Sequence, residues 1–246
     1  MAKLKWAHLT AGKDEPEFPM LGDDEGDDPI PPIESRLHHN ILRMPPESQQ
    51  ATGIVVFGRR IKSLLFSTDV AIIKNCDADA IFCVYPFISQ RSVSSAVIHA
   101  AAAPVFCGTG GGITQGSRAI YLSLDAENQG AMGVVFNAPI PNRDLREAAS
   151  VLDVPIVVTV VSEKTNVKKR IENGASILNV AAGANTPDLV AKIRRELPRV
   201  PIMASGGKTG ETITATIEAG ANAIVYTPPS STELFRSVMD RYRDEL

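Results

Sequence analysis

The stretch PIMASGGKTGETITATIEAGANAIVYTPPS, residues 201–230, contains one period of a pattern that runs through most of the chain. A short apolar run begins at Pro201, a helical segment follows the glycines, and a second apolar run begins just after Gly220 and Ala221. Proline suits the first residue of a strand and glycine suits the position just past a helix, so both marks fall at the same end of their strands. The stretch therefore predicts strand, helix, strand, with the two strands parallel.

The same alternation recurs from residue 63 to the end of the chain. Such short apolar runs, each ending in polar residues or glycine, are typical of strands that are buried on both faces of a parallel sheet. The segments between them carry apolar residues at helical spacing. The runs are SLLFSTD (63–69), AIFCVYPF (80–87), PVFCGTGGG (104–112), MGVVFNAP (132–139), PIVVTVVS (155–162), SILNVAAG (176–183), PIMASGGK (201–208) and AIVYTPPS (223–230). Eight evenly spaced units predict an α/β fold, a closed parallel (β/α)8 barrel, the TIM barrel, over residues 63–246 rather than an open sheet.

Residues 1–62 lie outside this repeat and form a predicted N-terminal extension. Positions 14–28 carry eight carboxylates and no basic side chain, and three prolines follow by position 32. We expect an acidic, proline-containing arm that is flexible in part or caps the barrel. Within it, TGIVVFGRRIK (52–62) is expected to form an extra strand or hairpin over the N-terminal face of the barrel.

Composition excludes several classes of protein. A net charge of -3 and a pI near 5.8, without a basic run, argue against a nucleic-acid partner. The chain has neither a signal peptide nor an apolar run of the ~20 residues that a membrane span needs. Cys76, Cys83 and Cys107 fit neither a disulfide framework nor a zinc site, and no histidine ends an apolar run. We therefore expect a cytoplasmic protein without a metal, and a homodimer, because barrels often pair through loops or helices.

The last two apolar runs end in residues that suit a phosphate. In (β/α)8 barrels the active site lies at the C-terminal ends of the strands, and a phosphate commonly sits after the last two. Glycines allow close approach of the backbone, and a helix N-terminus offers unpaired amides. Ser230 and Glu233 have the spacing of a capping box. We predict a phosphate site made of Gly206, Gly207, Lys208, Thr209, Thr227 and Ser230. The alternative is that Gly206 and Gly207 only form a tight turn and bind nothing.

The segment SGGKTGETITATIEAGANAIVYTPPS (205–230) resembles the ribulose-phosphate-binding barrel superfamily, which includes thiamine-phosphate synthase and N-acetylmannosamine-6-phosphate epimerase. The resemblance covers residues 63–246 in architecture, and it implies a small phosphorylated ligand. Barrels that hold flavin mononucleotide (FMN) by its phosphate carry a similar pattern, so FMN stays open, and no other cofactor is predicted. The chain departs from the pattern at Pro228 and Pro229, which cannot donate amides, so the hydroxyls of Thr227 and Ser230 or later amides would have to serve.

Carboxylates and amides at strand ends are the candidates for catalysis. Asp69 is the first choice for a base or acid, because a carboxylate at the mouth of an apolar barrel is expected to have a raised pKa. Its alternative role is the N-cap of the helix that follows it. Glu163 is the second carboxylate. Asn137 and Asn179 lie inside apolar strands, where unpaired amides would be costly, so we expect them to bond a ligand or each other.

A glycine-rich loop, CGTGGGITQG (107–116), is the second candidate for ligand binding. Gly110, Gly111 and Gly112 would let a ligand pack against the main chain, and a simple turn or flexible lid is the alternative. Tyr85 and Thr159 complete the predicted substrate-contacting set. Cys83 and Cys107 are expected to be inert core thiols. A Schiff-base mechanism requires a desolvated lysine at a strand end. Only Lys164 and Lys208 lie near strand ends, and both stand beside polar residues, which argues against this mechanism.

These features together predict an enzyme of the isomerase or lyase type. It would act on a small phosphorylated metabolite by carboxylate acid-base chemistry. The alternative is a non-catalytic or regulatory barrel that binds a phosphorylated ligand, because the chain lacks a strand-end histidine or lysine. An FMN-binding barrel and a hydrolase are minor alternatives.

Overall fold

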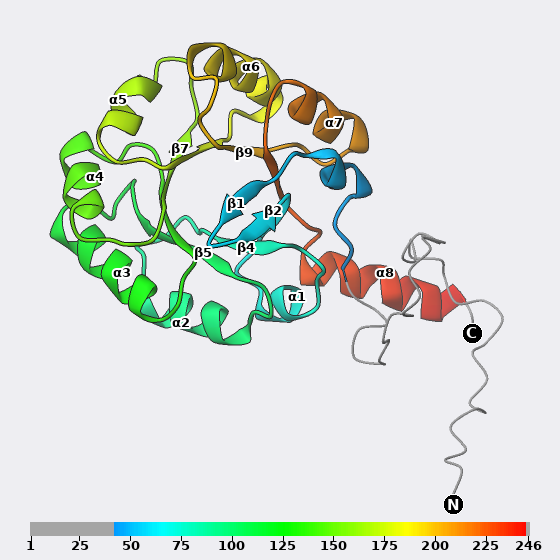
Figure 1. The fold of residues 1–246 in the computed structure, drawn as a ribbon. Helices are drawn as coiled ribbons and strands as arrows, with labels where there is room; N and C mark the ends of the chain where they lie inside the picture. The colour runs from blue at the N-terminus through cyan, green and yellow to red at the C-terminus, as the bar shows by residue number, and fades with distance from the viewer. Residues whose placement is uncertain (1–41, 245–246) are drawn as a thin grey trace, which may run out of the picture. The chain divides into compact units, whose positions relative to one another are not determined.

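In the computed structural model, which describes residues 42–244, eight parallel strands close into a barrel in the order β10-β3-β4-β5-β6-β7-β8-β9 (Figure 1). The strands are β3 (Ser63–Phe66), β4 (Ala80–Cys83), β5 (Val105–Gly110), β6 (Gly133–Phe136), β7 (Ile156–Val160), β8 (Ile177–Val180), β9 (Ile202–Ser205) and β10 (Ala223–Tyr226). Each strand lies within one of the eight apolar runs. The predicted (β/α)8 barrel is confirmed.

Helices follow the barrel strands and surround them in Figure 1. They are α1 (Val70–Lys74), α2 (Arg91–Ala100), α3 (Ser117–Asn128), α4 (Asn142–Ala149), α5 (Val167–Glu172), α6 (Thr186–Glu196), α7 (Gly210–Glu218) and α8 (Ser231–Asp244), with short 3₁₀ turns η2 (Pro46–Gln50) and η3 (Gly183–Asn185). No helix of the described part is long and apolar enough to span a bilayer.

The barrel has two separate apolar layers because successive side chains of a strand point to opposite faces. Leu64, Phe82, Phe106 and Val157 belong to the inner layer. Residues such as Leu65, which neighbours one of them in sequence, belong to the outer layer between strands and helices. Since both faces are buried, nearly every strand residue is apolar, which explains the continuous apolar runs.

A hairpin closes the N-terminal end of the barrel. Strand β1 (Ile54–Val56) pairs antiparallel with β2 (Arg59–Ile61), and Ile54, Val56 and Ile61 join the inner layer. The connecting residues Phe57 and Gly58 have φ of 47° and 79°, as a two-residue type I′ turn requires. The hairpin predicted within residues 52–62 is confirmed.

The rest of the described arm is tied to neighbouring loops and helices of the barrel. The amide of Met44 donates to Asp77 at 2.7 Å, and η2 packs against α7. The acidic positions 14–28 lie outside the described residues. The division of the chain at residue 62 and the character of the acidic arm therefore stay predictions.

The hairpin offers a matched test of the inner layer. Ile61→Ala should lower the free energy of unfolding by about 2–5 kcal/mol, because it deletes a fully buried side chain from the end of the barrel. Val55→Ala, on the exposed face of the same hairpin, should change it by no more than about 0.5 kcal/mol. Urea unfolding followed by circular dichroism measures both. Equal losses of stability in the two variants would contradict the conclusion that only one face of the hairpin packs into the barrel.

Candidate functional site

Polar side chains replace the inner apolar layer at the C-terminal ends of three adjacent strands. Val157 and Ile177 fill the barrel interior, and the next residues on the same face are Thr159 and Asn179. Asn137 follows the end of β6. The hydroxyl of Thr159 donates to Oδ1 of Asn137 at 3.2 Å and accepts from Nδ2 of Asn179 at 3.3 Å. The two asparagines therefore do not bond each other directly: each forms a hydrogen bond with Thr159, which lies between them.

One atom of this Asn137-Thr159-Asn179 network has no partner. Oδ1 of Asn179 is buried and accepts no hydrogen bond within the described residues, and Asn179 itself is only 3% exposed. A buried acceptor without a donor costs about 1–3 kcal/mol. Such an atom at the C-terminal end of the barrel strands makes this network a candidate ligand site.

Asp69 caps a helix, and its pKa differs from the expected one. Its carboxylate accepts from the amides of Ala71 and Ile72 and from the hydroxyl of Ser231. The Ser231 hydroxyl, helped by the two amides, lowers the pKa of Asp69 below its ordinary value despite some desolvation. The expectation of a raised pKa is wrong, and the alternative N-cap role is confirmed. Asp69 is ionised at neutral pH, and its stabilising contribution is lost as the pH falls through the lowered pKa.

The other charged candidates lie at the surface. Glu163 is exposed and forms an ion pair with Lys192 at 2.6 Å, and this contact lowers the pKa of Glu163. Lys164 and Lys208 are exposed in the loops after β7 and β9. None of the three is buried, whereas Thr159 and Asn179 of the network are.

The glycines of the predicted phosphate loop have packing reasons of their own. A Cβ at Gly206 would press on Ile224, and Gly207 has a φ of 88° and faces Thr212. Thr209 is the N-cap of α7 and forms a capping box with Thr212. A tight turn would therefore require these glycines even without a ligand.

The N-terminus of α7 retains donors and already has a carboxylate beside it. The cap takes the amide of Thr212, so the amides of Gly210 and Glu211 find no acceptor within the helix. Glu47 from η2 lies directly against Gly210, where a Cβ would collide with the carboxylate. An anion bound here would share the helix end with Glu47 and would be drawn by Lys208.

The capping box predicted at α8 is confirmed. Both the amide and the hydroxyl of Ser230 donate to the Glu233 carboxylate at 2.7 Å, and these bonds lower the pKa of Glu233. Ser230 is therefore engaged by its own helix. Thr227, the other hydroxyl predicted for phosphate, is exposed in the loop after β10.

The glycine-rich loop packs tightly against β6. A Cβ at Gly110 would strike the ring of Phe136, and one at Gly111 would strike the backbone of Asn137. Gly112 faces open space. Two of the three glycines therefore let the loop lie against the strand end that carries Asn137.

Side chains fix the surrounding loops. Tyr85 accepts from the amide of Gln90 at 2.7 Å, which holds the loop after β4. Asp144 is 1% exposed and accepts from the amide of Gly116 at 2.7 Å, which ties the glycine-rich loop to α4. Sequence analysis missed Asp144, because a charged residue in the first turn of an amphipathic helix looks like any solvated position.

The two strand cysteines are core residues, as predicted. Cys83 and Cys107 are buried, and desolvation raises the pKa of each thiol to about 12. Neither thiol is a nucleophile at neutral pH. Across residues 42–244 no three His, Cys, Asp or Glu side chains gather as they would around a metal ion.

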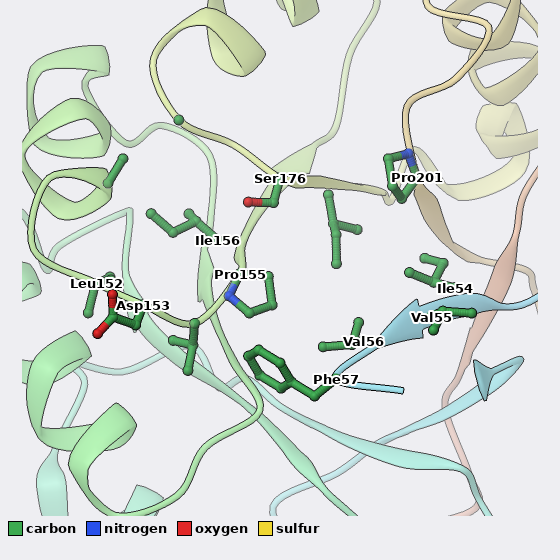
Figure 2. A pocket seen from close by; sticks show the side chains of 14 residues that line it. Ile54, Val55, Val56, Phe57, Leu152, Asp153, Pro155, Ile156, Ser176 and Pro201 are labelled. Atoms are coloured by element: carbon green, nitrogen blue, oxygen red, sulfur yellow. The ribbon is translucent and has the colours of Figure 1, made fainter. Parts of the chain in front are cut away.

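A cavity of about 440 Å³ lies at the N-terminal end of the barrel, opposite to the polar network. Figure 2 shows the hairpin residues 54–57 facing the starts of β7 and β8 across it. Most of the residues that line it are apolar by type, and Asp153 is the one ionisable side chain among them. This cavity therefore offers little acid-base chemistry, and the polar network remains the candidate site.

Comparison with known proteins establishes the fold. The chain matches no model of a protein family, and no curated protein matches it either. Among solved structures, phosphonopyruvate hydrolase with oxalate and Mg²⁺ is 14% identical with a TM-score of 0.58, over 77% of this chain and 84% of that one. A 2,3-dimethylmalate lyase of the PEP mutase/isocitrate lyase superfamily is 9% identical with a TM-score of 0.56, over 80% and 84%.

A 4-hydroxy-tetrahydrodipicolinate synthase from Methylacidiphilum fumariolicum SolV is also similar. It is 18% identical with a TM-score of 0.53, over 70% of this chain and 69% of that one. These likenesses support a (β/α)8 barrel and do not single out the ribulose-phosphate-binding superfamily.

Two substitutions in the network should change the stability of the protein in opposite directions. Thr159→Val keeps the shape of the side chain but leaves the Asn137 acceptor and the Asn179 donor without a hydrogen-bond partner. The free energy of unfolding should therefore fall by about 1–3 kcal/mol. Asn179→Leu removes the unpaired acceptor, so its stability should equal or exceed that of the parent. Urea unfolding measures both. Full stability of Thr159→Val would show that the network is not formed.

Proposed function

We propose that this chain is an enzyme of the lyase or isomerase type that acts on a small phosphorylated metabolite at the C-terminal end of its barrel. The observation that carries the proposal is the Asn137-Thr159-Asn179 network with its unpaired buried acceptor. An apolar layer would be more stable at this depth, so the polar side chains are best explained by a ligand that completes their hydrogen bonds.

The unpaired Oδ1 of Asn179 is an acceptor, so the network is suited to orient a hydroxyl or N–H group of the substrate by accepting its hydrogen. Fixed hydrogen-bonding groups in a water-poor site stabilise charge that develops during a reaction without having to reorganise. Asp69 is the proposed proton acceptor. Because its pKa is lowered, it would work as an ionised base, and the substrate would have to compete with the Ser231 hydroxyl for the carboxylate.

The phosphate is proposed to bind across the loops after β9 and β10. The amides of Gly210 and Glu211, which find no acceptor within α7, the charge of Lys208 and the exposed hydroxyl of Thr227 support this placement, and the Glu47 carboxylate beside Gly210 opposes it. The similar solved structures include a hydrolase, a lyase and a synthase, which is consistent with an enzymatic barrel. Their low identity does not carry any residue's role to this chain.

A regulatory barrel that binds a phosphorylated ligand without turnover is the second candidate. It is favoured by the engagement of both Asp69 oxygens in hydrogen bonds. A panel of sugar phosphates and phosphorylated acids, tested for binding and for turnover, distinguishes the two. Binding without turnover across the panel would favour regulation.

The pH dependence of catalysis tests Asp69. If Asp69 is the base, kcat/KM should fall on the acid side only below the ordinary pKa of an aspartate, because the Ser231 hydroxyl and the amides of Ala71 and Ile72 lower the pKa of Asp69 and keep its carboxylate ionised. Asp69→Asn should reduce kcat by at least about a hundredfold and leave KM nearly unchanged. A loss of stability of about 1 kcal/mol with full kcat would mean that Asp69 only caps α1.

Charge reversal tests the phosphate placement. Lys208→Glu should weaken binding of a phosphorylated ligand from that panel about tenfold or more, because it places a negative charge beside the α7 amides. Lys74→Glu makes the same change of net charge in the last turn of α1, towards the other end of the barrel, and should leave the affinity unchanged. Isothermal titration calorimetry measures both. Equal effects of the two variants would overturn the placement.

A further inference from the structure

A polar pocket of about 390 Å³ lies between the loop after β6 and the loop after β7. Both loops leave the C-terminal ends of their strands, so the pocket shares this end of the barrel with the Asn137-Thr159-Asn179 network. The amide of Ile140, which lines the pocket, donates to the carbonyl of Asn137 at 3.1 Å. The same short loop therefore connects the network to the pocket.

Two cations line this pocket without a balancing carboxylate. Lys164 and Arg170 form no ion pair with any of the described residues. Asn142, Thr165 and Asn166 supply the remaining polar lining. A pocket with two positive charges and several neutral hydrogen-bonding groups is suited to an oxyanion.

The position of Arg170 strengthens this reading. One guanidinium nitrogen donates to the carbonyl of Ile140 at 2.6 Å and to Oδ1 of Asn142 at 2.7 Å. Both acceptors are neutral, and desolvation lowers the pKa of Arg170. The group is thus a partly buried charge, fixed in place, with neutral acceptors at one nitrogen and further N–H groups available.

Neighbouring cations, unlike Lys164 and Arg170, form ion pairs. Arg143 pairs with Asp144 at 3.0 Å, and Lys192 pairs with Glu163 at 2.6 Å. Asp144 and Glu163 are therefore committed to other partners, and no carboxylate lines the pocket to compensate its positive charge.

We propose that this pocket is a second anion site, which binds a phosphate or carboxylate group of the substrate. The proposal rests on the proposed function and narrows its substrate class to small metabolites with anionic groups at two ends. In the barrel order β8 lies between the two strands whose loops form this pocket and the two whose loops form the proposed phosphate site, and the network spans β6 to β8. A substrate held at both ends would present its middle atoms to Asn137, Thr159 and Asn179.

Residue-resolved NMR titration with inorganic phosphate, at constant ionic strength, tests the pocket separately from catalysis. Phosphate should shift the amides of residues 140–142 and 164–166 in the parent. Lys164→Gln, at an exposed position, should weaken this response about tenfold. Lys169→Gln removes a neighbouring lysine that does not line the pocket and should leave the response unchanged. Arg170→Lys keeps the charge, loses the paired hydrogen bonds and should weaken the response as well.

The outcomes are decisive for the pocket. No shift at these amides in the parent, or an equal response in Lys164→Gln and the parent, would overturn the second anion site. Shifts confined to residues 206–211 would overturn it while supporting the phosphate placement after β9. Absence of turnover across the substrate panel, with the pocket response intact, would instead count against the proposed enzymatic function.

Discussion

Closure of a parallel sheet is the constraint on which this structure depends. In the ring of eight strands each strand has neighbours on both sides, helices lie on the outside, and the inside must be filled by its own side chains. Phe82 and Phe106 fill the middle of the barrel, and Ile54 and Ile61 of the hairpin fill its N-terminal end. At the C-terminal ends of β6, β7 and β8 the inner positions are instead the polar residues Asn137, Thr159 and Asn179.

Polar groups at that end are costly unless they are paired, and most of them are paired within the chain. Asp69 caps α1 and contacts Ser231, and Glu233 binds the amide and hydroxyl of Ser230. These bonds stabilise loops rather than bind ligands. The unpaired oxygen of Asn179 and the uncompensated charge of Arg170 stand out against this background, because the first is buried without a donor and the second is partly buried with neutral acceptors only.

The two ends of the barrel therefore differ in chemistry. The N-terminal end combines the apolar hairpin with a cavity that is lined by one ionisable side chain, Asp153 (Figure 2). The C-terminal end combines neutral amides, a hydroxyl, helix N-termini and uncompensated cations. This asymmetry supports placing ligand binding at the C-terminal end, even though the cavity at the N-terminal end is larger than the pocket between the loops after β6 and β7.

The sequence by itself determined what depends on near neighbours along the chain. The eight strands, the hairpin over 52–62 and the capping box of Ser230 and Glu233 all follow from local periodicity and spacing. Only the tertiary structure decided which distant side chains meet. The contact of Ser231 with Asp69 reversed the expected pKa shift, Thr159 joined two asparagines, and Arg170 came to line a pocket from within a helix. Such contacts depend on how the sheet closes and on the path of each loop, and no local pattern of residues encodes either.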